Sequence, residues 1–148
     1  MSTNSESAPE FLADKLILKL SITMSADQRA VDEVVQRVMD VIREKDCAAG
    51  RDNAIELSLS EALANAVVHG AKLDASKRVE CDVACDENRS LLIVVRDPGE
   101  GFDPAMVASP VRGQNIYSNH GRGVYLINQL MDEVKYLKNG TEIHMIKR

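Results

Sequence analysis

The segment LSEALANAVVHG, residues 59–70, predicts the second half of a helix that begins near residue 52 and is closed by Gly70. Glu61 and Asn65 are four residues apart, so both project from one side of this helix. The pair is either an exposed polar face or a carboxylate and an amide directed at a ligand. The opposite side carries an apolar stripe for burial, which consists of Ile55, Leu59, Leu63, Ala66 and Val67.

A second pattern, DPGEGFD at residues 97–103, directly follows the apolar run 91–95, which predicts a central strand. The end of a strand can direct a side chain such as Asp97 into a cleft. Gly99 and Gly101 would let the backbone approach a ligand closely and adopt positive φ angles. The alternative is a tight turn that Asp97 initiates.

A third pattern, Gly121-Arg122-Gly123, precedes a short helix expected over residues 123–130. Unpaired amides and the helix dipole make a helix N-terminus attractive to phosphate, although an ordinary glycine-rich helix start has the same sequence. Arg122 either contacts a phosphate or is solvated. Residues 105–120 are small, polar and contain Gly and Pro, which predicts a mobile loop that could close over a nucleotide. The chain contains no P-loop sequence.

The remaining pattern predicts one mainly antiparallel sheet. The other elements expected are a strand at 15–20, a helix from an S-x-x-Q capping box at Ser25 to about Lys45, and strands at 78–84, 134–137 and 141–146. Asn139-Gly140 joins the last two strands and is a strong hairpin signal. With the helices on one face, the fold class is a two-layer α/β sandwich. We expect residues 1–14 to form a disordered tail and residues 15–148 to form one domain.

Composition excludes several classes of partner. The chain has 148 residues and a formal net charge of −5, and its Lys and Arg residues form no stripe. Direct binding of nucleic acid or of an anionic membrane surface is therefore not expected, because both need clustered positive charge. No apolar run approaches the ~18 residues of a membrane span, and the N-terminus has no secretory signal pattern. We expect a cytoplasmic protein.

The three cysteines do not suggest a disulfide framework or a zinc site by their spacing. Cys81 and Cys85 share the parity of the apolar residues in the strand expected at 78–84, so we interpret them as apolar filler on one face. Cys47 has no neighbouring cysteine. These features predict a reducing compartment.

The patterns occur in one order, which ends with NGTE, residues 139–142, before the last strand. In this order they resemble the Bergerat-type ATP site of the GHKL group, which includes DNA gyrase, heat-shock chaperone, histidine kinase and mismatch-repair ATPases. Within this group the chain resembles the anti-sigma regulatory factors that are serine-protein kinases. The resemblance extends over about residues 15–147 and implies a histidine kinase-like ATPase domain with the Bergerat fold.

The resemblance implies a role for each residue at the phosphate end of the site. Asn65 would ligate Mg²⁺ through its amide oxygen, because this ion prefers oxygen ligands and keeps phosphates and waters in its shell. Glu61 would be the general base. Gly121 and Gly123 would donate backbone amides to the phosphates.

At the nucleobase end, the resemblance implies that Asp97 accepts a hydrogen bond from the exocyclic amine of adenine. Guanine has a carbonyl at that ring position, which a carboxylate would repel. Gly99 and Gly101 would make room for the base and the ribose. Thr141 would support the adenine contact with its hydroxyl.

The implied function is that of an ATP-dependent protein-serine kinase. It would phosphorylate an anti-sigma-factor antagonist, a STAS-type protein, or sequester a sigma factor, or both. The resemblance also implies homodimerisation. The alternative is a non-catalytic module that binds ATP only to shape a docking surface. Glu61 favours the kinase, because a pure binding module needs no base at that position.

Overall fold

The structure is a computed structural model that describes residues 15–101 and 119–148 of the chain. The tail predicted at 1–14 and most of the loop predicted at 105–120 lie outside these residues. The elements in chain order are β1 (Leu16–Ser25), α1 (Gln28–Glu44), α2 (Asp52–Asn65), the π-helical turn η2 (Ala66–Gly70), β2 (Arg78–Asp86), β3 (Leu91–Arg96), α4 (Asn119–Leu130), β4 (Glu133–Leu137) and β5 (Glu142–Lys147).

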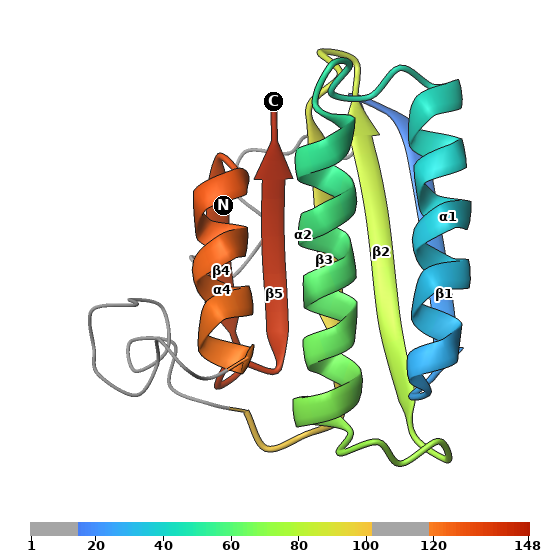
Figure 1. Cartoon of the computed structure of the whole chain (residues 1–148). Helices are drawn as coiled ribbons and strands as arrows, with labels where there is room; N and C mark the ends of the chain where they lie inside the picture. The colour runs from blue at the N-terminus through green and yellow to red at the C-terminus, as the bar shows by residue number, and fades with distance from the viewer. Residues whose placement is uncertain (1–14, 102–118) are drawn as a thin grey trace.

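The five strands form a single sheet in the order β1-β2-β3-β5-β4, and every neighbouring pair is antiparallel. Figure 1 shows α1, α2 and α4 side by side on one face of this sheet. The predicted two-layer α/β sandwich is therefore confirmed. Because β3 and β5 are antiparallel neighbours, the end of β3 lies beside the start of β5. Residues that follow β3 therefore lie beside residues that precede β5.

The main core is aliphatic and lies between the helices and the sheet. The apolar stripe predicted for this helix is confirmed, because Ile55, Leu59 and Leu63 of α2 and Val67 of η2 are all fully buried. A second, smaller cluster of buried residues lies on the opposite face of the sheet and consists of Leu92, Val94 and Ile146. Across the described parts of the chain, no helix is both long and apolar enough to span a membrane.

Two predictions about the first helix and strand are wrong. The N-cap of α1 is Asp27, whose Oδ1 accepts a hydrogen bond of 2.9 Å from the amide of Arg29. Ser25 instead ends β1, and its hydroxyl donates to the carbonyl oxygen of Ala75 at 2.7 Å. The strand runs beyond the predicted residue 20 because its second half pairs with the start of β2, up to Ser25 opposite Arg78.

The hairpin between β4 and β5 is confirmed, but its turn is wider than two residues. Lys138, Asn139 and Gly140 have φ angles of 53°, 60° and 83°. The amide of Gly140 donates to the carbonyl oxygen of Leu137 at 3.1 Å. The turn therefore leaves β4 one residue earlier than the Asn-Gly pair alone predicts and directs Thr141 towards the end of β3.

The prediction that the cysteines form no disulfide is wrong for two of them. Cys47, which follows α1, is joined by a disulfide to Cys85 near the end of β2, 38 residues further along the chain. Sequence spacing could not show this pair, because only the packing of α1 on the sheet brings the two segments together. Cys81 is a free, fully buried thiol, as expected of apolar filler.

We expect the disulfide to stabilise the domain. A cross-link that closes a loop of 38 residues restricts the unfolded chain and should contribute about 2–4 kcal/mol to the free energy of unfolding. Thermal unfolding with and without reductant measures this contribution. The double variant Cys47→Ser/Cys85→Ser is the control and should unfold at the same temperature with and without reductant. An unfolding temperature of the parent chain that is equally insensitive would contradict the bond.

Candidate functional site

The described residues enclose a cavity of about 160 Å³ between the helical layer and the sheet. Its floor is a row of side chains from three neighbouring strands, Val95 of β3, Ile143 of β5 and Tyr136 of β4, which are paired across the sheet. The other lining residues are Ala62, Asn65, Ala66, His69, Gly70, Asp97, Gly101, Val124, Ile127, Gly140 and Thr141. A largely apolar cavity with a few convergent polar groups is typical of a small-molecule site.

Asp97 is the acidic group of this cavity and is held from two directions. Its Oδ1 accepts a hydrogen bond of 2.8 Å from the amide of Gly99, and its own amide donates to the carbonyl oxygen of Thr141 at 2.9 Å. Oδ2 accepts no hydrogen bond from the described residues. Burial raises the pKa of the Asp97 carboxyl, and the Gly99 hydrogen bond opposes that effect only in part. Asp97 can therefore offer one free acceptor oxygen to a ligand.

Thr141 lies beside Asp97 and also lines the cavity. Its hydroxyl donates to the carbonyl oxygen of Lys138 at 2.7 Å. Because that bond uses the hydroxyl hydrogen, Thr141 can act towards a ligand only as an acceptor. A donor on the ligand, such as an exocyclic amine or a water, is the group that fits both Asp97 and Thr141.

Three glycines let the segments around Asp97 approach one another. A Cβ on Gly70 would lie 2.3 Å from Cγ of Asp97, and a Cβ on Gly99 would lie 2.4 Å from the carbonyl oxygen of Gly70. Gly101 has a φ of 89°, and its Cβ would lie 1.8 Å from the carbonyl oxygen of Asn139. No side chain fits at these positions. The glycines therefore fix the backbones of η2, the end of β3 and the β4–β5 turn against one another.

The turn η2 interrupts the helix that the sequence predicts to continue to residue 69. The amide of Ala71 donates to the carbonyl oxygen of Ala66 at 2.8 Å, the wide spacing of a π-helix. Such turns are frequent at functional sites. Here the turn brings Gly70 onto Asp97 and places His69 on the cavity lining. Partial burial lowers the pKa of His69, so its ring is mostly neutral at pH 7.

Glu61 and Asn65 lie one turn apart on α2, as predicted, and α4 packs against both. A Cβ on Gly123 would lie 2.6 Å from Oε1 of Glu61 and 3.1 Å from Nδ2 of Asn65. Asn65 lines the cavity, whereas Glu61 lies just outside its lining. The structure thus brings Glu61, Asn65 and Gly123 together at the edge of the cavity.

The helix α4 begins at Asn119, four residues before the expected start. Gly121 therefore falls among the first four residues, whose amides have no partner within a helix, whereas Gly123 is the fifth residue. The amide of Gly121 is therefore free of helical hydrogen bonds and can donate to a phosphate, as predicted. The amide of Gly123 could do so only if the first turn of the helix opened. Arg122 also belongs to this turn, and its side chain lies outside what the structure describes. The phosphate-binding roles of these three residues stay predictions.

The donor set suits Mg²⁺ only if a ligand contributes to its shell. Among residues 15–101 and 119–148, no three His, Cys, Asp or Glu side chains form a group that could hold a metal ion. Mg²⁺ is commonly held by one or two protein oxygens together with phosphates and waters. The amide oxygen of Asn65, at the cavity edge, fits that arrangement.

The structure brings four of the sequence-predicted site residues, Asn65, Asp97, Gly101 and Thr141, together on one cavity. Their binding roles stay predictions. Sequence reasoning missed Gly70 as a site residue and interpreted it only as a helix end. The packing of Gly70 against Asp97 depends on the π-helical turn, which no pattern in the sequence indicates. Sequence reasoning also missed Tyr136, although the alternation of the strand after residue 133 places that ring on the helix-facing side.

Comparison with known proteins gives one matching family and several relatives. A family model described as a histidine kinase-like ATPase domain matches residues 24–147. The serine-protein kinase RsbW of Bacillus licheniformis is 34% identical over 100 residues, which are 63% of this chain and 62% of that protein. RsbW of Staphylococcus epidermidis is 35% identical over 101 residues, 62% of each chain. RsbW of Bacillus subtilis is 32% identical over 100 residues, 63% of this chain and 62% of the relative. These matches span less than two thirds of the relatives' length.

We predict that Gly70→Ala displaces Asp97 and weakens binding of an adenine nucleotide at least about tenfold, which corresponds to roughly 1.4 kcal/mol. Calorimetric titration with Mg·ATP measures this loss. Gly50→Ala is the matched control, because Gly50 has a φ of 84° but a Cβ added there would meet no atom within 4 Å. That variant should lose stability through backbone strain alone and keep its affinity. If Gly70→Ala bound Mg·ATP as tightly as Gly50→Ala, Gly70 would not be needed to position the site.

We also predict that nucleotide affinity falls in acid, and that the fall begins at a higher pH than an aspartate with an ordinary pKa would cause. Burial raises the pKa of free Asp97, and a donor on the ligand would lower it again in the complex. Affinity should therefore be full above the pKa of the free protein and fall as the pH drops through it. Asp97→Asn should lack this fall and bind about 1.5–3 kcal/mol more weakly at neutral pH. Superimposable pH profiles for the two proteins would contradict the assignment.

Proposed function

Because the chain belongs to the histidine kinase-like ATPase domain family, we propose that it binds Mg·ATP in the cavity between α2, α4 and the sheet and phosphorylates a serine of a partner protein. The observation that carries the proposal is the placement of Asn65 and Asp97 on one cavity, with Glu61 one turn from Asn65 at its edge. This placement supports a role for Asp97 as acceptor for a nucleobase and, beside it, roles for Asn65 and Glu61 in phosphoryl transfer.

The nucleobase would lie against the floor formed by Val95, Ile143 and Tyr136. Its exocyclic amine would donate to the free oxygen of Asp97, with Thr141 as a second acceptor for the same amine or for a bridging water. Since both groups accept and neither offers a hydrogen, adenine fits and guanine, which has a carbonyl there, does not. This asymmetry supports selection of adenine over guanine.

At the other end of the cavity, Asn65 would hold Mg²⁺, which neutralises charge on the phosphates. Glu61 would accept the proton of the serine hydroxyl as its oxygen attacks the γ-phosphorus. The bond from that phosphorus to the bridging oxygen of ADP breaks in the same transfer. Glu61 is partly buried, and Gly123 of α4 packs against its carboxylate.

The family resemblance and the printed names of the relatives, which are serine-protein kinases, support a regulatory kinase. The proposed phosphate acceptor is an anti-sigma-factor antagonist of the STAS type. A sigma factor is the second proposed partner, held by a homodimer of the chain. A cytoplasmic location belongs to the same proposal and rests on these partners alone. The disulfide of Cys47 with Cys85 removes the cysteine argument for a reducing compartment.

One observation favours a non-catalytic nucleotide-binding module instead. Gly123 of α4 packs against the carboxylate of Glu61, and Glu61 is not part of the cavity lining. In a pure binding module this contact would stay closed when ATP binds. In a kinase, Gly123 must move away from Glu61 before the serine hydroxyl can approach.

Glu61→Gln distinguishes the two functions. The amide keeps the size of the side chain but removes its basicity, and a general base contributes about 10²–10⁴-fold to a proton-transfer step. The variant should bind Mg·ATP as the parent chain does and lose phosphate transfer to the antagonist by that factor. Transfer of radiolabelled γ-phosphate to candidate antagonist proteins measures it, with nucleotide affinity determined in parallel.

Asn65→Ala is the companion variant and should lose the Mg²⁺-dependent part of ATP affinity. Neither change should lower thermal stability much, because the buried stripe of α2 lies on the other side of the helix. If the parent chain binds ATP but phosphorylates no antagonist, the binding module is correct. If Glu61→Gln transfers phosphate at the parental rate, Glu61 is not the base.

A further inference from the structure

A network of charged side chains spans three strands on the face of the sheet opposite the helices. Arg96, the last residue of β3, has its Nη1 2.5 Å from Oδ2 of Asp82 and 3.8 Å from Oε1 of Glu80, both on β2. Its Nε lies 3.2 Å from Oε1 of Glu142, the first residue of β5. One guanidinium therefore bridges the central strand to both of its neighbours.

Glu142 is held at both of its oxygens. Its Oε1 faces Arg96 and lies 3.8 Å from Nζ of Lys138, and its Oε2 lies 2.6 Å from Nε2 of His144. The side chains of Glu142 and His144 are 9% and 8% exposed, so this end of the network is shielded from water. Burial opposes the charge on Glu142, but the hydrogen bond with His144 and the charge of Arg96 outweigh it and lower the pKa of Glu142.

The network lies directly behind the nucleobase end of the cavity. Arg96 and Glu142 are opposite each other in the pairing of β3 with β5, and theirs is the last rung of that ladder. The next residues outward are Asp97 and Thr141, which are joined by the 2.9 Å hydrogen bond from amide to carbonyl. Because side chains alternate between faces, the charged pair and the cavity residues share one backbone junction but point to opposite sides.

We propose that Arg96 is a positioning residue for nucleobase selection: by clamping β3 to β5 at their last rung, it sets the separation of Asp97 and Thr141 and hence the preference for a base with an exocyclic amine. This inference rests on the proposed function. Arg96 touches no nucleotide and acts only through the backbone junction. Its removal takes away the cation that Glu80, Asp82 and Glu142 share, whereas Lys138 stays 3.8 Å from Glu142.

The test compares the affinities of ATP and inosine triphosphate, which carries a carbonyl in place of the amine. In Arg96→Gln, Asp97 is displaced, so ATP should lose a hydrogen bond to a charged group that inosine triphosphate never makes. The ratio of the two affinities should fall about tenfold or more. Glu142→Gln should lower the ratio in the same direction but less, and Arg96→Lys should restore part of it.

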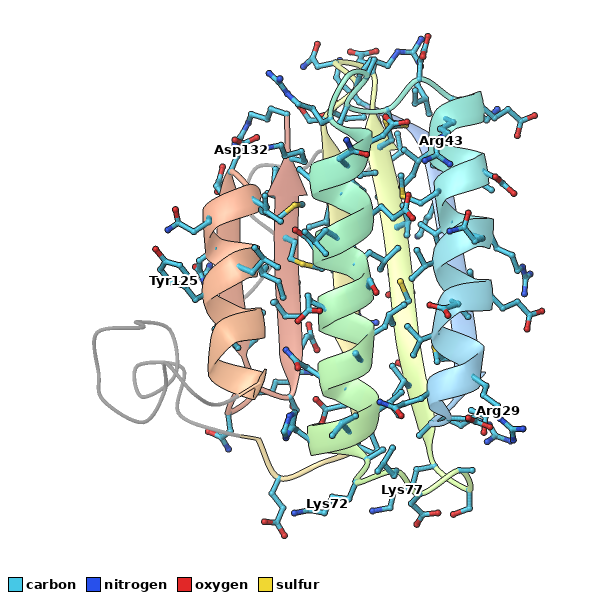
Figure 2. All side chains as sticks on the ribbon, in the orientation of Figure 1. Arg29, Arg43, Lys72, Lys77, Tyr125 and Asp132 are labelled. Carbon is cyan, nitrogen blue, oxygen red and sulfur yellow. A yellow bond between two sulfur atoms is a disulfide. The ribbon has the colours of Figure 1, made fainter. Side chains whose placement is uncertain are left out.

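Arg43→Gln is the matched control. Arg43 also bridges two elements through two carboxylates, Asp52 at 2.8 Å and Glu56 at 3.3 Å on α2. Figure 2 shows Arg43 at one end of the helical layer and Lys72, just after η2, at the other. This variant can lose stability but should keep the parental ratio, which separates positioning from general destabilisation.

The outcomes are distinct. A parental ratio in both Arg96→Gln and Glu142→Gln would overturn the inference while leaving the proposed function intact. Should Arg96→Gln fail to fold, Glu142→Gln decides alone. If the parent chain bound neither nucleotide, that result would contradict the proposed function and therefore also this inference.

Discussion

The close contact of η2 with the end of β3 is the constraint on which the site depends. Gly70 and Gly99 have no side chains, so the backbone of η2 can reach Asp97. The amide of Asp97 in turn continues the β3–β5 pairing by donating to the carbonyl oxygen of Thr141, just before β5. Three segments distant in sequence meet at this one junction. A larger residue at Gly70 or Gly99 would separate them, and the cavity would lose its acceptor group while the aliphatic core stayed intact.

The two faces of the sheet contribute differently to this junction. On the helix-facing side, the buried stripe of α2 positions the helix, so that Asn65 and Glu61 point away from the core towards α4. On the other side, Arg96 and Glu142 hold the same strand ends by charge. The core therefore fixes where the cavity lies, and the local contacts at its rim fix which groups a ligand meets. For this reason, a change at the rim can alter ligand recognition without a large change in the stability of the fold.

Local sequence patterns predicted the parts of the fold that depend on local physics. The spacing of Leu59, Leu63 and Val67 predicted the buried face of α2, and Asn139-Gly140 predicted the hairpin. What the patterns missed depends on long-range packing. The disulfide of Cys47 with Cys85 and the contact of Gly70 with Asp97 exist only once the helices lie on the sheet. The capping role of Asp27 was missed because Ser25, which matched the local motif, is used by β1.

The most direct test is a methyl NMR titration with Mg²⁺ and a non-hydrolysable ATP analogue. Val95, Ile127 and Ile143 line the cavity, whereas Leu92, Val94 and Ile146 form the buried cluster on the opposite face. We predict that the analogue shifts the methyl resonances of the first group strongly and saturably and those of the second group little. No saturable shift at the cavity methyls, or shifts confined to the opposite cluster, would contradict nucleotide binding at this site.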